Sequence, residues 1–192
     1  EVHPDLPLMV DANTDYAYPE DLDRLKALDA FGLIMLEQPL TWEDLYFHAR
    51  LQADLDTPIC LDESIVSPYN ARVAAALGSC RIINIKPGRV GGFGESRAIH
   101  DLCRAAGVPV WCGGMLESGI GRAHNVALAT LPGFTLPGDI SESRRYWAED
   151  IVDPEFVMRD GFMPVPEGPG IGVRPRLDRI ESLQTRYEAF TA

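Results

Sequence analysis

Three carboxylates and a lysine recur at a regular spacing in the first half of this 192-residue chain. Asp11, Glu37 and Asp62 each follow directly after a short apolar run, and Lys86 follows the next run. Three carboxylates that converge repel one another unless a cation joins them, and hard oxygen ligands of this kind suit Mg²⁺. A lysine next in the series can reach a substrate that such a metal carries. The pattern therefore predicts a metal centre with an adjacent amine.

The apolar runs ahead of these residues predict strands that are buried on both faces. Near-continuous apolar runs of this length are typical of parallel sheets. The residues that end the runs lie 24 to 26 positions apart along the chain. We predict strands at residues 6–10, 33–36, 59–61, 82–85 and 108–112, with a weaker one at 134–136.

The segments between the predicted strands carry helical signals. Thr41 and Ser67 can cap the starts of two helices, Gly78 ends the helix that Ser67 begins, and Gly107 ends another. Alternating strands and helices indicate a (β/α) barrel or an open doubly wound sheet, which are both α/β folds. No Gly-x-Gly-x-x-Gly motif follows the first strand, so a dinucleotide-binding sheet has little support. The predicted helices cover residues 19–28, 42–54, 69–77, 95–106 and 122–131.

The alternation stops after residue 140. Residues 156–165 predict a hairpin around an Asp160-Gly161 turn, and residues 177–190 predict a closing helix. The expected apolar face of that helix holds Leu177, Ile180, Leu183, Tyr187 and Phe190. We therefore expect a partial (β/α) barrel over residues 1–140 and a C-terminal segment over residues 141–192.

The barrel interpretation gives the three carboxylates and the lysine a common location. The carboxyl ends of barrel strands lie side by side around the mouth, where active sites are built. An acidic residue after a strand can also cap the next helix or pair with a lysine. Three carboxylates at the same strand position, followed by a lysine, favour the metal site over three independent caps. The glycine-rich residues 88–94 are expected to shape the rim of the barrel, or else to cradle a phosphate.

The overall composition excludes several classes of partner. The chain has 29 acidic and 17 basic side chains and a formal net charge of −12, which disfavours binding to nucleic acid. No apolar run is long enough to span a bilayer, so we expect no membrane partner. The cysteine usage leads us to expect a reducing, cytoplasmic location. Because the cysteines form no metal-binding or disulfide pattern, we expect free buried thiols at Cys60, Cys80, Cys103 and Cys112.

Several motifs resemble a known family. Asp11-Ala12-Asn13, Glu37-Gln38-Pro39 and Asp62-Glu63-Ser64, followed by Lys86, resemble the enolase superfamily in its muconate-lactonizing subgroup. Residues 84–92, 113–122, 136–139 and 166–173 narrow the resemblance to the o-succinylbenzoate synthases and N-acylamino acid racemases. Relatives that epimerise dipeptides carry Asp-x-Asp where this chain has Asp139-Ile140-Ser141, which argues against that activity.

The resemblance implies roles for individual residues. Asp11, Glu37 and Asp62 are expected to bind Mg²⁺, with Mn²⁺ or another divalent metal as alternatives. Lys86 matches the catalytic lysine on the sixth barrel strand. Three further positions match residues that line the substrate pocket, and they are Asn13, Gly114 and Met115. Glu63 and Glu117 are candidates for orienting lysines, or for ordinary surface ion pairs.

The resemblance also implies a fold and a reaction. The chain is expected to hold strands three to eight of an enolase-type (β/α)₈ barrel of the TIM type, without the N-terminal capping domain. The implied reaction is a Mg²⁺-dependent dehydration of 2-succinyl-6-hydroxy-2,4-cyclohexadiene-1-carboxylate, through an enediolate, in menaquinone biosynthesis. The family's general base, a second-strand lysine about one repeat before Asp11, is not in this chain.

Three other interpretations remain open at this point. The same site could racemise N-acylamino acids, or the chain could be a non-catalytic metal-binding fragment. An unrelated phosphate-binding barrel enzyme is less favoured, because it does not need three acidic strand ends. The expected partner is a small-molecule carboxylate, and the full-length protein is expected to form a homo-oligomer.

Overall fold

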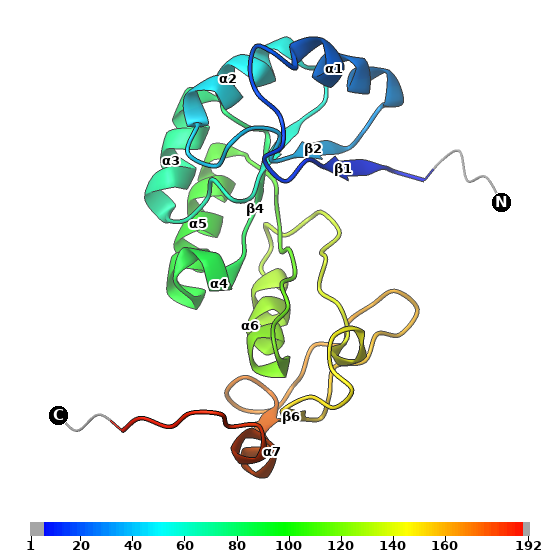
Figure 1. Ribbon diagram of the computed structural model, residues 1–192, viewed down its shortest axis with the longest axis vertical. Helices are drawn as coiled ribbons and strands as arrows, with labels where there is room; N and C mark the ends of the chain where they lie inside the picture. Colours follow the sequence, from blue (N-terminus) through cyan, green and yellow to red (C-terminus); the bar gives the residue numbers. More distant parts are fainter. Residues whose placement is uncertain (1–5, 190–192) are drawn as a thin grey trace. The chain divides into compact units, whose positions relative to one another are not determined.

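The computed structural model describes residues 6–189, which form two compact units (Figure 1). The first unit contains the chain up to Gly113 together with Leu128–Gly138. The second contains Gly114–Ala127 and the residues from Asp139 onward. The boundary at residue 140 that the sequence suggests stays a prediction.

The first unit is built on five parallel strands in sequential order. The expected α/β class with a parallel sheet is therefore confirmed, and the sequential strand order agrees with a partial barrel. The strands are β1 (Met9–Asp11), β2 (Met35–Glu37), β3 (Ile59–Leu61), β4 (Ile82–Asn84) and β5 (Val110–Trp111).

Burial differs along the sheet. Every residue of β2, β3, β4 and β5 is buried, as their apolar runs predict. The prediction was wrong for β1, whose three residues are all exposed, because this strand pairs only with β2. The weak sixth run contributes a single bridge between Val110 and Phe134 rather than a strand.

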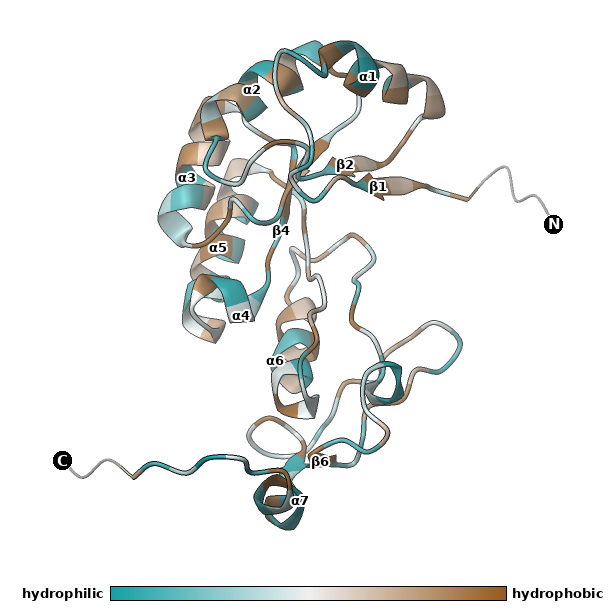
Figure 2. Ribbon diagram, viewed as in Figure 1, coloured by the Kyte–Doolittle hydropathy of each residue, from teal (hydrophilic) through white to brown (hydrophobic). Residues whose placement is uncertain are grey.

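Helices alternate with these strands and lie along the outer side of the first unit in Figure 1. α3 packs against both α2 and α5. Apolar residues are frequent along the strands, whereas the helices mix polar and apolar residues, as Figure 2 shows. This mixed colouring is typical of helices that cover a sheet with one face. The helical segments are α1 (Leu22–Ala27), η1 (Leu28–Phe31), α2 (Leu45–Asp54), α3 (Pro68–Leu77), α4 (Pro87–Val90) and α5 (Phe93–Ala106).

Local capping explains where these helices begin. Ser67 caps α3 and Pro68 occupies its first turn, as the sequence predicts. The predicted cap of α2 was wrong: Asp44, not Thr41, accepts a hydrogen bond from the Phe47 amide at 2.8 Å, so the helix begins three residues later than predicted. The expected rim loop also contains a short helix, α4.

Side chains from four strands of the first unit form a buried core. Met35, Cys60, Ile82 and Trp111 form one buried cluster. The indole Nε1 of Trp111 donates a hydrogen bond to Cys60 Sγ at 3.2 Å. All four cysteines are buried, and none of them forms a disulfide. None of the helices in residues 6–189 has both the length and the apolar character that a bilayer crossing requires.

The second unit has its own core and its own buried ion pair. The core residues are Ala123, Val126, Val152, Phe156 and Val173. Arg122 pairs with Asp150 at 3.2 Å, and both side chains are buried. Asp150 also accepts from the Gly119 amide at 2.9 Å, at the start of the helix. The elements here are α6 (Gly119–Ala129), η2 (Ser143–Arg145), β6 (Val152–Asp153), β7 (Arg174–Pro175) and α7 (Leu177–Ser182).

Two predictions for this unit need correction. The Asp160-Gly161 turn is confirmed, because Arg159 and Phe162 exchange backbone hydrogen bonds across it, but it joins no extended strands. The antiparallel pair is instead β6 with β7. The closing helix ends at Ser182, and Tyr187 of its expected apolar face is 78% exposed. Phe190 lies outside the described residues.

Candidate functional site

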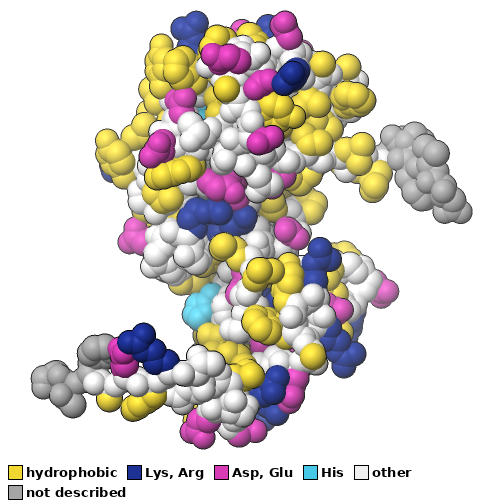
Figure 3. All heavy atoms as spheres, viewed as in Figure 1, with side chains coloured by type: hydrophobic (Ala, Val, Ile, Leu, Met, Phe, Trp, Pro, Cys, Tyr) yellow, Lys and Arg dark blue, Asp and Glu magenta, His cyan; other side chains and the backbone are white. Residues whose placement is uncertain are grey.

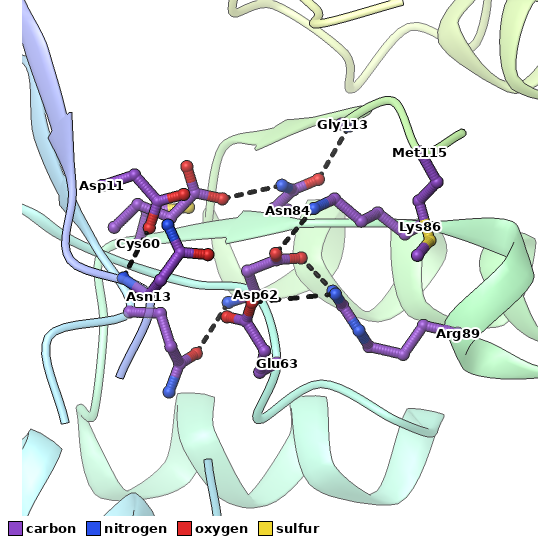
Figure 4. Close-up of polar contacts among 12 residues, drawn as sticks. Asp11, Asn13, Cys60, Asp62, Glu63, Asn84, Lys86, Arg89, Gly113 and Met115 are labelled. Atoms are coloured by element: carbon purple, nitrogen blue, oxygen red, sulfur yellow. Dashed lines mark hydrogen bonds and ion pairs between the residues drawn. The ribbon is translucent and has the colours of Figure 1, made fainter. Parts of the chain in front are cut away.

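The carboxyl ends of four neighbouring strands bring the predicted polar residues together (Figure 4). Asp11 and Glu37 are direct partners in the register of β1 and β2. Asp62 directly follows β3, and Lys86 lies two residues beyond the end of β4. Because parallel strands end at the same edge of a sheet, four separate sequence segments deliver these side chains to one place.

Glu37 is a buried carboxylate, with 3% of its surface exposed. Its Oε1 accepts a hydrogen bond from Asn84 Nδ2 at 2.8 Å. Burial, together with the nearby carboxylates of Asp62 and Asp11, raises the pKa of Glu37 to about 7 against the opposing effect of the Asn84 bond. A cation bound between the three carboxylates would stabilise the ionised form of Glu37.

Asp62 is neutralised by two basic side chains. Lys86 Nζ lies 2.7 Å from Asp62 Oδ2, and Arg89 Nη1 bonds the other oxygen, Oδ1. Asp62 is 2% exposed, so these are largely desolvated ion pairs. The alternative interpretation of an acidic strand end, pairing with a lysine, therefore also describes Asp62.

Arg89 joins this group of residues, and the sequence analysis did not predict it. It lies three residues after Lys86 on α4, so one turn of this short helix returns its guanidinium to Asp62. Its Nη2 also lies 3.9 Å from Glu63 Oε1, so Glu63 accompanies an arginine rather than a lysine. Burial, followed by the charge of Asp62, raises the pKa of Glu63. The i, i+3 spacing of Lys86 and Arg89 was the available signal.

Asn84 links Glu37 to the end of β5. Its Nδ2 donates to Glu37, while its Oδ1 accepts from the Gly113 amide at 2.7 Å. A Cβ on Gly113 would lie 2.5 Å from Asn84 Nδ2 and 2.5 Å from Lys86 Cε. A side chain at this position would therefore force the ends of the Asn84 and Lys86 side chains to shift.

Asn13 lies beside Asp11 in a left-handed backbone conformation. The Asn13 amide donates to Asp11 Oδ1 at 2.9 Å. Asn13, Thr14 and Gln38 all have positive φ values, between 35° and 70°. Residues other than glycine rarely adopt this conformation, and such strain concentrates at functional sites.

Gly114 and Met115, the remaining predicted residues, belong to the second unit. A Cβ on Gly114 would lie 2.1 Å from the Asp139 carbonyl oxygen, so glycine is required there as well. The Met115 amide donates to both carboxylate oxygens of Glu117, at 3.0 and 2.9 Å. Glu117 thus fixes the backbone of this loop rather than a lysine.

These residues have the oxygen donors that a divalent metal prefers. Their side chains, however, are not arranged around a common metal position. In residues 6–189 no three Asp, Glu, His or Cys side chains are grouped closely enough to hold a metal ion. Asp62 directs both of its oxygens at Lys86 and Arg89. The donor set still fits, because three carboxylates end adjacent strands and one is buried with a raised pKa.

Comparisons with known proteins identify the family. Residues 1–179 match the family model described as "Enolase C-terminal domain-like". The o-succinylbenzoate synthase of Geobacillus stearothermophilus is 63% identical over 189 residues, which cover 98% of this chain and 49% of that protein. The N-succinylamino acid racemase of Thermus thermophilus is 53% identical, over 97% of this chain and 51% of that protein.

The solved structures give the same result. An enolase superfamily member from Listeria innocua superposes with a TM-score of 0.89 and 49% identity, over 93% of this chain and 48% of that one. The resemblance that the motifs suggest is therefore confirmed. The chain spans about half the length of the curated relatives it matches.

Proposed function

Because the chain belongs to the enolase C-terminal domain-like family, we propose that it supplies the metal ligands and one catalytic lysine of a Mg²⁺-dependent o-succinylbenzoate synthase. The proposed substrate is 2-succinyl-6-hydroxy-2,4-cyclohexadiene-1-carboxylate, which loses water to form an aromatic product in menaquinone biosynthesis. The observation that carries the proposal is the convergence of three carboxylates and Lys86 at four neighbouring strand ends.

The proposed ligands are Asp11, Glu37 and Asp62. A divalent cation held by them supplies positive charge opposite the negative charge that develops on the substrate carboxylate. Such charge stabilisation is needed, because each pKa unit between a carbon acid and its base costs about 1.4 kcal/mol. Asn84 orients Glu37 for this role through its 2.8 Å hydrogen bond.

Lys86 has the electrostatic role in this proposal. Its ammonium is held 2.7 Å from Asp62, on a side chain that is only partly exposed. When Asp62 turns to the metal, Lys86 Nζ is free to stabilise the substrate's developing charge, and Arg89 still holds Asp62 in place. Asn13, Gly114 and Met115 are proposed to line the substrate pocket.

A second candidate function is the racemisation of N-succinylamino acids, which the similarity to proteins of that name favours. In that reaction Lys86 acts as one of two bases rather than as an electrostatic group. We further propose that the whole protein is a cytoplasmic homo-oligomer, with the barrel segment at residues 1–140 and its completion at 141–192.

A chimera tests the proposed function. This chain would replace the matching half of the Geobacillus stearothermophilus o-succinylbenzoate synthase, to which it is 63% identical. We expect the chimera to form o-succinylbenzoate only with Mg²⁺ present. The Lys86→Met variant should reduce kcat about 100-fold or more, because a preorganised charge at the reacting centre is lost. Ultraviolet absorbance follows the aromatic product, and polarimetry follows racemisation.

Lys26, the other lysine of the chain, provides the matched control. It is on α1, with its Nζ 3.9 Å from Asp54 Oδ1 in a surface pair that contributes little stability. The Lys26→Met chimera should keep full activity. A chimera that folds by circular dichroism but shows neither dehydration nor racemisation would overturn the proposal, as would undiminished activity in Lys86→Met.

A further inference from the structure

Gln38 contacts all three strand ends that carry the carboxylates. It follows Glu37 at the end of β2, and its carbonyl accepts from the Thr14 amide, just after β1, at 2.8 Å. Its own amide donates to the Cys60 carbonyl in β3 at 2.9 Å. The side chain then reaches past the end of β3, to Asp62 and Ser64. One residue therefore joins the segments that hold Asp11, Glu37 and Asp62.

The side chain of Gln38 is fully buried and uses both ends of its amide. Oε1 accepts from the Asp62 amide at 3.0 Å and from the Ser64 amide at 3.2 Å. Nε2 donates to Ser64 Oγ at 2.8 Å and to the Leu40 carbonyl at 3.1 Å. The side-chain amide of Gln38 accepts a hydrogen bond from the backbone of Asp62. It therefore fixes the backbone position from which the Asp62 side chain extends.

The backbone of Gln38 is strained, with a φ of 35°. A residue other than glycine persists in this conformation only when its surroundings hold it there. The buried amide bonds supply that restraint. The strain is thus maintained where two carboxylate-bearing strands end.

His48 supports the same turn from α2. The Leu40 amide donates to His48 Nε2 at 3.2 Å, so this nitrogen must accept and the proton resides on Nδ1. Nδ1 donates to the Asp44 carbonyl. Burial lowers the pKa of His48, which keeps the ring neutral and able to accept. The turn at Leu40, which Gln38 also bonds, is therefore anchored to a helix.

We infer that Gln38 is a positioning residue that sets the spacing of the Glu37 and Asp62 carboxylates for a divalent cation. This inference depends on the metal centre of the proposed function. Residues that orient metal ligands typically change metal affinity by about 10- to 100-fold when they are replaced.

The experiment compares two buried glutamines of this chain. Gln38→Met keeps the side-chain length and removes its amide hydrogen bonds to Leu40, Ser64 and Asp62, and the longer 3.5 Å contact with His48 Nε2. Gln52→Met is the matched control. Gln52, on α2, is also buried, and its side chain accepts from the Ile59 amide at 2.7 Å and donates to the Thr57 carbonyl at 3.2 Å. These hydrogen bonds are at the start of β3, the end opposite to the carboxylates.

Isothermal titration with Mg²⁺ and thermal unfolding with and without Mg²⁺ give the two readouts. We expect both variants to lower the melting temperature of the metal-free chain. Only Gln38→Met should weaken Mg²⁺ binding, by about 10-fold or more, and reduce the stabilisation by Mg²⁺. A purely structural role predicts equal effects of Mg²⁺ on both variants.

The outcomes separate this inference from the proposed function. If the wild-type chain does not bind Mg²⁺, the proposed metal centre and this inference both fail. If the wild type binds and Gln38→Met binds equally well, only the inference fails. If Gln38→Met does not fold, Ser64→Ala replaces it in the experiment. This variant removes only the 2.8 Å hydrogen bond between Gln38 Nε2 and Ser64 Oγ. The inference then stands only if Ser64→Ala weakens Mg²⁺ binding several-fold.

Discussion

Glu37 shows most clearly how the environment of a residue changes its chemistry. Its sequence position indicates a metal ligand, but only the structure reveals that it is buried beside two other carboxylates. Its pKa of about 7 means that the metal-free site holds a proton at slightly acidic pH. Metal binding must displace that proton, so Mg²⁺ affinity should increase as the pH rises through 7.

The raised pKa also predicts how stability depends on pH. The folded chain binds a proton at Glu37 that the unfolded chain releases above its ordinary pKa of 4.5. The group therefore stabilises the metal-free fold most below pH 4.5, and this stabilisation is lost as the pH rises through 7. The loss is at most about 3 kcal/mol.

Urea unfolding of the metal-free chain between pH 4.5 and pH 8 measures this effect. Glu37→Gln provides the comparison, because its amide cannot ionise. We expect the free energy of unfolding to decline more steeply with pH in the wild type than in Glu37→Gln. Parallel pH profiles for the two proteins would contradict the raised pKa.

Arg89 and Asn84 show which site residues the sequence leaves undetermined. Neither residue type is diagnostic of a metal centre. Their roles come from partners far away in the sequence, since Asn84 bonds Glu37 and Arg89 bonds Asp62. Such pairings depend on which strand ends meet, and a single sequence does not specify them.

At the scale of elements, the approach of β5 to β4 depends on Gly113. Replacing this glycine with alanine places a Cβ only 2.5 Å from Asn84 Nδ2 and 2.5 Å from Lys86 Cε. We expect Gly113→Ala to destabilise the chain by about 1–3 kcal/mol and to weaken Mg²⁺ binding, because Asn84 must shift away from Glu37.

Gly94→Ala provides the control for this substitution. Gly94 lies in the first turn of α5, and a Cβ there meets nothing within 4 Å. Alanine should stabilise the helix there by up to about 1 kcal/mol. Chemical denaturation compares the two variants, and equal stability would show that β5 tolerates a side chain at this position.

Helix boundaries divide into those set locally and those set by tertiary contacts. Ser67-Pro68 and Gly78 delimit α3 where the sequence predicts, because a cap acts through adjacent residues. The helix predicted to reach residue 190 ends at Ser182 instead. Leu177 and Leu183 of its apolar face are exposed in the described chain. These side chains therefore provide no tertiary packing that would stabilise a longer helix.

At the scale of the whole molecule, the apolar surface is unevenly distributed. Apolar side chains gather on the segment that leads into β1, which Figure 3 shows next to the grey N-terminal residues. Leu6, Leu8, Met9 and Val10 are all exposed there. An exposed, apolar edge strand favours association, so the isolated chain should be prone to aggregate.

Thiol labelling of the cysteines measures opening of the first unit alone, because all four cysteines precede Gly114. Burial raises the pKa of Cys80 and Cys103 to about 12, and it also raises that of Cys60. Reaction with a thiol reagent requires an accessible thiolate. We expect labelling of the native chain to be at least about 1,000-fold slower than in urea, because it requires the unit to open.

Trp147 fluorescence, measured with Trp42 and Trp111 of the first unit replaced by phenylalanine, provides the companion measurement, because Trp147 belongs to the second unit, which contains no cysteine. Its indole Nε1 donates to the Glu117 carbonyl at 3.0 Å. Each unit has a separate core, so labelling should follow the opening of the first. Fast labelling of the folded chain would contradict the burial of the thiols.

The sequence by itself determined the parallel α/β class, the positions of five strands and the placement of Asp11, Glu37, Asp62 and Lys86 at four strand ends. These features follow from local patterns, namely apolar runs and the polar residues that end them. Tertiary structure alone decided that Asp62 pairs with both Lys86 and Arg89, that Gln38 joins three strand ends, and that Glu37 holds its proton near neutral pH. The physical reason is that ion pairs, buried amide bonds and desolvation depend on which distant segments meet, and only the folded chain brings them together.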